Sequence, residues 1–137
     1  MNLVDVYTDL PRAIPMLYKL LAEREPHQSI SHKRMPTYTQ HEDFVCSVPY
    51  AEWYMVVDAY DIAGAVYLTK QREIGIGIFK AHRGKGLASA AVREVMHLHG
   101  PGRFLANINP QNQDSVELFR QIGFSGPVQI TLEANVA

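Results

Sequence analysis

The stretch EIGIGIFKAHRGKGLAS, residues 73–89, decides the fold. In residues 73–79 three isoleucines alternate with a glutamate and two glycines, and this period of two is typical of a β-strand that buries one face. A glycine-rich turn follows and leads into a segment with helical periodicity at about 86–98. The sequence therefore predicts a strand, a tight turn and a helix in direct succession.

The face of this strand opposite the isoleucines carries Glu73, Gly75, Gly77 and Phe79. Glycine weakens a strand because it packs nothing and adds chain entropy to the unfolded state. Two glycines on one face therefore indicate either a bulge or close approach by a ligand, or a crowded contact between a helix and the sheet.

The turn after the strand has the properties of a phosphate site. Glycines allow several N–H groups to converge, a helix N-terminus adds partial positive charge, and Arg83 and Lys85 add full charges. A Walker loop would need Ser or Thr where Gly86 stands. A dinucleotide fingerprint would need Gly or Ala in place of Ser89 and an acidic residue near 104–108, so a nucleotide-binding enzyme is the least favoured class.

Working outward from this stretch, residues 53–57 and 62–68 show strand periodicity and are separated by short polar breaks, which predicts an antiparallel meander ending at 73–79. Further along the chain we expect a strand at 104–108, a helix at 112–122 and a last strand at 128–132. A strand, a helix and a strand in series require a crossover, so the strands at 73–79 and 104–108 should be parallel.

The N-terminal part is less regular. Residues 3–6 indicate a short strand, and a helix should begin behind Asp9 and Pro11. Residues 25–40 are expected to be a loop, followed by a helix at about 40–47. The predicted fold class is α/β, with a central mixed sheet and helices on both faces.

The composition is that of one globular domain spanning residues 1–137, with 47% hydrophobic and 20% charged residues. The formal net charge of -1 and scattered Lys and Arg argue against nucleic acid as a partner. No apolar run of about 20 residues and no secretion signal are present, so we expect no membrane partner and a cytoplasmic location. The single cysteine, Cys46, agrees with a reducing compartment, and we interpret it as a small buried hydrophobe rather than a nucleophile.

No metal site is expected. His27, His32 and His41 are not spaced as ligands on one helical face, and no cysteine pair accompanies them. Histidines at the surface or in hydrogen bonds account for them.

Two stretches together resemble the GNAT superfamily of N-acetyltransferases. The coenzyme A loop of this family has Gln or Arg, two residues, Gly, one residue, then Gly or Ala, and Arg83, Gly86 and Ala88 fill this pattern. The stretch NQDSVELFRQIGF at 112–124 is similar to the family's Asn-x-x-Ser/Ala helix that ends in Gly-Phe. The resemblance covers residues 73–124 and implies acetyl-CoA as donor of an acetyl group.

The resemblance also implies a GNAT-like fold, in which an antiparallel N-terminal meander is followed by two parallel strands that splay apart around the coenzyme arm. The residues it assigns to coenzyme binding are the strand residues Ile76, Gly77, Ile78 and Phe79, the turn residues Arg83, Gly84, Lys85, Gly86, Leu87, Ala88 and Ser89, and the helix residues Asn112, Ser115 and Phe119. A main-chain N–H near Ile78 or Phe79 would stabilise the oxyanion.

The implied activity is direct transfer of the acetyl group to a primary amine of a small molecule, an amino sugar among the candidates, or of a peptide. Glu73 is the candidate base, and the alternative is a solvated charge at the start of a strand. Phe119 stands where many relatives have a proton-donating Tyr, so Tyr67 or a water is the candidate acid. A domain that senses acyl-CoA without catalysis is the alternative function. An exposed edge at 128–132 would favour a homodimer.

Overall fold

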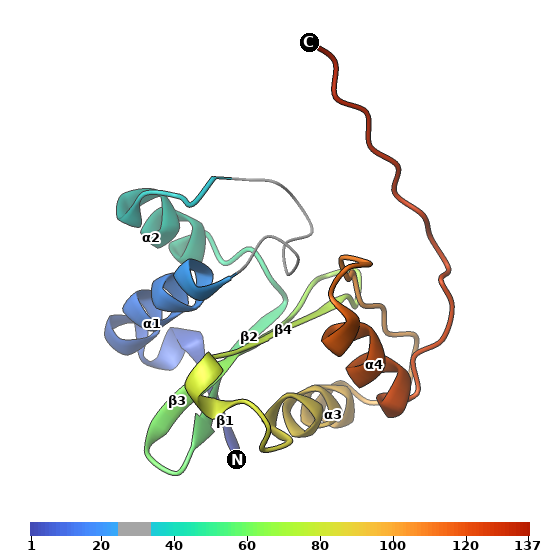
Figure 1. The fold of residues 1–137 in the computed structure, drawn as a ribbon. Helices are drawn as coiled ribbons and strands as arrows, with labels where there is room; N and C mark the ends of the chain where they lie inside the picture. Colours follow the sequence, from blue (N-terminus) through green and yellow to red (C-terminus); the bar gives the residue numbers. More distant parts are fainter. Residues whose placement is uncertain (25–33) are drawn as a thin grey trace.

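Four strands form one antiparallel sheet in the order β1-β2-β3-β4 (Figure 1). They are β1 (Asn2–Asp5), β2 (Glu52–Asp58), β3 (Asp61–Leu68) and β4 (Ile74–Ile78). The structure is a computed structural model, and it describes residues 1–24 and 34–137. The predicted meander is confirmed, and the short turns between β2, β3 and β4 keep strands that follow one another in sequence adjacent in the sheet.

Helices cover both faces of the sheet, as expected (Figure 1). α1 (Leu10–Glu23) and α2 (Tyr38–Cys46) pack on one face, and α3 (Leu87–His99) and α4 (Gln113–Ile122) on the other. Each pair has its own apolar cluster with the sheet, so the core consists of two layers.

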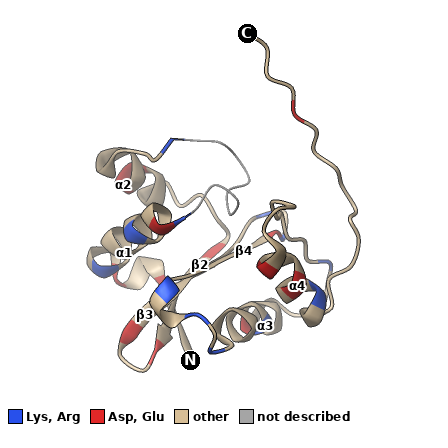
Figure 2. Ribbon diagram, viewed as in Figure 1, with Lys and Arg blue, Asp and Glu red and all other residues tan. Residues whose placement is uncertain are grey.

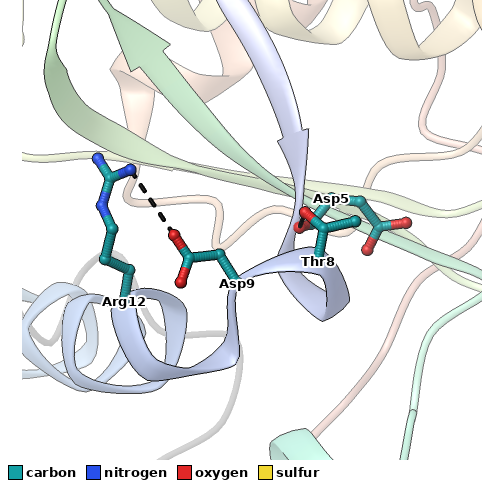
Figure 3. Close-up of polar contacts among 4 residues, drawn as sticks. All are labelled: Asp5, Thr8, Asp9 and Arg12. Atoms are coloured by element: carbon teal, nitrogen blue, oxygen red, sulfur yellow. Dashed lines mark hydrogen bonds and ion pairs between the residues drawn. The ribbon is translucent and has the colours of Figure 1, made fainter.

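β1 passes into α1 through one turn of 3-10 helix, η1 (Val6–Thr8), whose polar contacts Figure 3 shows. The Thr8 hydroxyl donates to the Asp5 carbonyl at 2.7 Å. Asp9 precedes the first turn of α1, and its carboxylate lies 3.7 Å from the Arg12 guanidinium. The turn redirects the chain across the sheet, which brings Leu20 of α1 against Gly77 of β4.

α2 begins two residues earlier than predicted because Thr37 and Gln40 form a capping box. The Thr37 side chain accepts the Gln40 N–H at 3.2 Å, and the Gln40 side chain accepts the Thr37 N–H at 2.9 Å. The pattern Thr-x-x-Gln was a sequence signal for this start.

The prediction that Cys46 is buried is wrong, because its side chain is exposed. The buried face of α2 is formed by His41 and Val45, which are four residues apart and so lie on the same side of the helix. Cys46 is one residue further on, about 100° around the helix from Val45. His41 itself is buried, and its Nε2 lies 2.9 Å from the Ile14 carbonyl oxygen. His27 and His32 lie outside the described residues.

Two predicted strands are not formed. Residues 104–108 make a single parallel bridge, Glu73 with Leu105, instead of a parallel strand beside β4. Asn107 agrees with the end of the pairing after Leu105, since Asn is disfavoured in strands. The described sheet is therefore antiparallel, and the expected parallel splayed pair of strands is absent from it.

Residues 128–132 are extended and exposed rather than paired (Figure 1). The side chains of Val128, Ile130 and Leu132 are 66%, 75% and 87% exposed. A period of two predicts which residues share a face, but it supplies no partner strand, and an isolated strand is unstable in water. The argument for a dimer through a strand edge here therefore no longer applies.

Within the part of the chain that the structure describes, no helix has both the length and the apolar character needed to cross a membrane.

Candidate active site

The edge of β4 that faces away from β3 is open. The Phe79 N–H donates to the Ala63 carbonyl at 2.8 Å, so odd-numbered residues of β4 direct their backbone groups toward β3. Successive residues in a strand direct their backbone groups to opposite sides, so the N–H groups of Ile76 and Ile78 point away from β3. Neither N–H has an acceptor among residues 1–24 and 34–137.

The open edge begins where β4 meets residues 104–108. Ile74 N donates to the Leu105 carbonyl at 2.8 Å, and Leu105 N donates to the Arg72 carbonyl at 2.9 Å. No further bridge follows, so the two segments separate after this contact. This separation exposes the backbone of Ile76 and Ile78.

The turn after β4 presents a row of N–H donors. It passes through η3 (Lys80–His82) and two left-handed glycines, Gly84 with φ 81° and Gly86 with φ 74°. Gly86 is the N-cap of α3 and has no side chain with which to cap the helix. The N–H groups of residues 84–89 have no acceptor in the described part of the chain, and the helix dipole adds partial positive charge to them.

The cationic side chains of the turn are partly engaged elsewhere. Arg83 donates from Nε to the Ile78 carbonyl at 3.2 Å, which anchors the turn to the end of β4. Lys85 is directed to β2, where its Nζ lies 3.7 Å from an Asp58 oxygen. Figure 2 shows the positive residues of this turn in blue between β3 and α3. Leu87 is buried, and Ala88 and Ser89 are half-buried at the start of α3.

The helix residues assigned to the coenzyme have structural roles in the described structure. Asn112 caps α4 by accepting the Ser115 N–H on its side-chain oxygen at 3.3 Å. Phe119 is 4% exposed and packs edge-on against Phe124, with ring centroids 5.0 Å apart. Phe119 therefore lies in the core between α4 and the sheet.

Glu73 lies at the bridge to Leu105, the point from which β4 and residues 104–108 separate. Its Oε1 accepts the Thr69 hydroxyl at 3.2 Å, and its Oε2 accepts the Asn107 side-chain amide. The Thr69 hydroxyl also accepts the Glu73 N–H at 3.0 Å. The carboxylate is therefore held on both oxygens instead of moving freely in solvent.

Tyr67 of β3 lies on the same face of the sheet as Glu73, across the hairpin from Gly75. Its ring stacks on Tyr50, with centroids 4.0 Å apart and planes 6° from parallel. Burial raises the pKa of the Tyr67 hydroxyl; Arg24 acts to lower it and the charge of Glu73 to raise it. Tyr67 therefore remains protonated near neutral pH and can donate a hydrogen bond or a proton.

Sequence reasoning missed Thr69, Arg72 and Asn107, because no motif marks them. The Arg72 guanidinium donates to the carbonyls of Gly100 and Arg103 at 3.2 and 3.1 Å and lies 4.2 Å from the Phe104 ring centroid. The only signal for Asn107 was the expected pairing of residues 104–108 with residues 73–79, which places it near Glu73.

An open strand edge, a donor-rich turn and a carboxylate on the same strand agree with the family that most of the chain matches. A model of the acetyltransferase (GNAT) domain matches residues 13–125. The chain therefore belongs to the GNAT family of acetyltransferases, whose members use acetyl-CoA, and the resemblance drawn from residues 73–124 is confirmed.

Solved structures with a similar fold include several acetyltransferases. Aminoglycoside 6'-N-acetyltransferase AAC(6')-IG from Acinetobacter haemolyticus has a TM-score of 0.68 and 14% identity, over 100% of this chain and 99% of that one. The protein yncA from Salmonella typhimurium, solved with its cofactor acetyl-CoA, has a TM-score of 0.66 and 15% identity, over 91% and 80%. A chimera of spermidine N-acetyltransferase SpeG from Vibrio cholerae and hSSAT has a TM-score of 0.67 and 17% identity, over 91% and 82%. No curated protein matches the sequence.

Proposed function

We propose that residues 1–137 act as one domain that transfers the acetyl group of acetyl-CoA directly to a primary amine of a small molecule or a peptide. The observation that carries this proposal is the row of unaccepted N–H groups at residues 84–89, together with the N–H groups of Ile76 and Ile78 at the open edge of β4. A diphosphate and an amide-containing arm are ligands that such donors suit.

The register of β4 refines which strand residues would bind the donor substrate. Ile76 and Ile78 offer their N–H groups, whereas Gly77 faces β3 with its backbone and the Phe79 N–H is already donated to Ala63. We therefore assign the oxyanion contact to the Ile78 N–H. Arg83 and Lys85 would add charge near the diphosphate, Lys85 after leaving Asp58.

Glu73 is the group that we assign to proton removal. A free alkylammonium has a pKa of about 10, so the acceptor arrives protonated and must lose a proton before its nitrogen attacks. The amine nitrogen then forms a bond to the thioester carbon, the carbon–sulfur bond breaks, and the acetylated amine and a thiolate are the products. The ammonium loses its first proton to the Glu73 carboxylate, directly or through a water, before the attack. The nitrogen loses its second proton to water as the carbon–sulfur bond breaks, which leaves a neutral amide.

Tyr67 is the candidate donor of a proton to the thiolate, because Phe119 has no hydroxyl and is buried in the core. Burial keeps Tyr67 protonated. A thiolate with a pKa of about 8.5 is a tolerable leaving group, so this step makes a modest demand on the acid.

The acceptor is proposed only by class. The related structures include enzymes named for an aminoglycoside and for spermidine, both of which carry primary amines. An amino sugar is one candidate that the sequence suggested, and aromatic residues Tyr50, Trp53 and Tyr67 lie near the Glu73 side of the sheet, where a sugar or an alkylammonium would stack.

Thiol release from acetyl-CoA tests this function with a panel of aminoglycosides, polyamines, amino acids and peptide N-termini. Release that depends on one amine class, with mass gain of one acetyl group on that amine, supports the proposal. Binding of acetyl-CoA without release for any acceptor supports a sensor. Stabilisation by NAD or ATP, and not by acetyl-CoA, contradicts the proposal.

A further inference from the structure

We infer that Asn107 is a positioning residue for the candidate base Glu73, an inference that rests on the proposed function. The Asn107 side-chain Nδ2 donates to Glu73 Oε2, while the Thr69 hydroxyl donates to Oε1. Glu73 thus receives one neutral donor on each oxygen. Each carboxylate oxygen has two acceptor sites, so one site on each remains for the amine or a water.

The chemistry of an amide suits this task. A neutral donor fixes the orientation of the carboxylate and interacts more favourably with its charged form than with its protonated form. A Lys or Arg at position 107 would stabilise the carboxylate much more strongly and weaken it as a proton acceptor. Asn therefore orients the carboxylate and preserves its basicity.

Asn107 reaches Glu73 because Arg72 holds the segment that carries it. The Arg72 carbonyl accepts the Leu105 N–H at 2.9 Å, and its guanidinium binds the carbonyls of Gly100 and Arg103 and stacks on the Phe104 ring. The segment is therefore fixed up to Leu105, two residues before Asn107. In an extended chain residues two apart point to the same side, so the bridge at Leu105 sets where the Asn107 amide lies.

Among the described residues, several other ionisable groups lie on this side of the sheet, including Tyr67, Tyr50, Arg24 and His41. Tyr67 of β3 and Tyr50 before β2 stay neutral near pH 7, because burial raises the pKa of both hydroxyls. Arg24 at the end of α1 acts electrostatically on both tyrosines. His41 of α2 is buried on this side of the sheet, with its Nε2 near the Ile14 carbonyl. All of these groups are the same in the parent and in the Asn107 variants, so a difference between their pH profiles reports on the surroundings of Glu73.

The test compares the pH dependence of kcat/KM in Asn107→Asp, Asn107→Ala and the parent chain. Asn107→Asp keeps the shape of the side chain but replaces its N–H donor with a negative charge beside the Glu73 carboxylate. The acid limb of the profile should therefore move to higher pH by about one unit or more. Asn107→Ala removes the donor alone and should move the limb in the same direction by a smaller amount. KM for acetyl-CoA should not change, because Asn107 is outside the donor turn.

Asn135→Asp is the matched control. Asn135 is also exposed and also donates to a glutamate, Glu133, at 3.5 Å, but it lies in the C-terminal segment. It should leave the profile where it is. A general effect of added negative charge would move the limb equally in both Asp variants, and that result would overturn the inference.

Glu73→Gln separates this inference from the proposed function. If Glu73→Gln removes the acid limb while Asn107→Asp leaves the limb in place, Glu73 is the base and the role of Asn107 is wrong. If Glu73→Gln leaves both rate and profile unaltered, the base lies elsewhere and both assignments fall. A thermal melt of each Asn107 variant within a few degrees of the parent shows that the shift does not come from unfolding.

Discussion

The Tyr67 ring lies directly over Gly75. A Cβ atom built on Gly75 would lie 2.1 Å from Tyr67 Cζ and 2.4 Å from its hydroxyl oxygen. Tyr67 is held there by its stack on Tyr50. Gly75 is therefore explained by the aromatic pair. The crowding comes from a neighbouring strand and not, as the sequence suggested, from a helix packed on the sheet.

Alanine at the three sheet glycines should destabilise the protein in a fixed order. At Gly64 a Cβ would lie 2.0 Å from the Gly77 carbonyl oxygen, a backbone atom that cannot move aside, so Gly64→Ala should cost well above 3 kcal/mol or prevent folding. Gly75→Ala should cost about 1–3 kcal/mol because the Tyr67 ring must leave its stack. Gly77→Ala meets only the flexible Leu20 side chain at 3.3 Å and should change stability by less than about 1 kcal/mol. Urea unfolding measures all three, and a Gly77→Ala cost equal to that of Gly64→Ala would show that the sheet packs differently.

Gly86→Glu should abolish coenzyme binding while the protein stays folded. Nothing lies within 4 Å of a Cβ at this position, so the side chain meets no protein atom, but its charge would face the proposed diphosphate site. Like charges at a binding site cost several kcal/mol, which corresponds to an affinity loss of about a hundredfold or more. Calorimetric titration with coenzyme A measures it. Gly86→Ala is the matched control for backbone strain, because either side chain must adopt the left-handed φ of 74° that Gly86 has. The alanine variant should lose far less affinity for coenzyme A than the glutamate variant. Equal affinity in the Glu variant and the parent would mean that the turn does not bind the diphosphate.

Arg72→Lys should loosen the start of the gap beside β4. Lysine keeps the charge but has no planar fork to reach two carbonyls and stacks less well on Phe104, so we expect a loss of about 1–2 kcal/mol. Hydrogen exchange should accelerate at the amides of Ile74 and Leu105, which form the bridge. Arg120→Lys on the exposed side of α4 controls for the change of residue type. Unchanged exchange at both amides in the Arg72 variant would show that the contacts of the Arg72 guanidinium are not needed to hold the bridge.

Alkaline pH should destabilise the fold partly through Tyr54. Burial and the hydrogen bond to Glu52 at 2.9 Å raise the pKa of Tyr54 from 10.0 to about 12. The native state then holds the proton more tightly than the unfolded state, so the stabilisation is complete below pH 10 and is lost as pH rises toward 12. The free energy of unfolding of Tyr54→Phe should fall less steeply over this range, whereas Tyr60→Phe, whose side chain is 94% exposed, should follow the parent. Parallel curves for the parent and Tyr54→Phe would contradict the assignment.

Much of the fold follows from local patterns in the sequence. The period of two in β2, β3 and β4 and the apolar faces of α3 and α4 predicted these elements to within one or two residues, because each pattern is decided by neighbours in the chain. Residues 104–108 and 128–132 carried equally good strand patterns, yet neither forms a strand. A strand depends on a partner edge, and the pattern of one segment does not reveal whether that edge is available.

The part of the candidate site that the sequence indicated is the turn after β4, where backbone conformation requires glycine. Gly84 and Gly86 both have the left-handed backbone for which glycine is needed, and Gly86 is the glycine that the family motif requires. Glu73 was proposed from its position on the strand, but its partners Thr69 and Asn107 were not, because side chains from three segments meet there only after folding. Phe119 was recognised as a departure from the family pattern, and its burial shows that the position serves the core.

The left-handed backbone at Gly86 limits how the start of α3 can be stabilised by the protein itself. A residue that caps a helix with its own side chain needs extended backbone angles, so no substitution at position 86 can supply that cap without rebuilding the turn. The first N–H groups of α3 therefore have no side-chain cap in the described structure, and the diphosphate that we propose would satisfy them. A change that capped this helix from within the protein would compete with that ligand for the same donors.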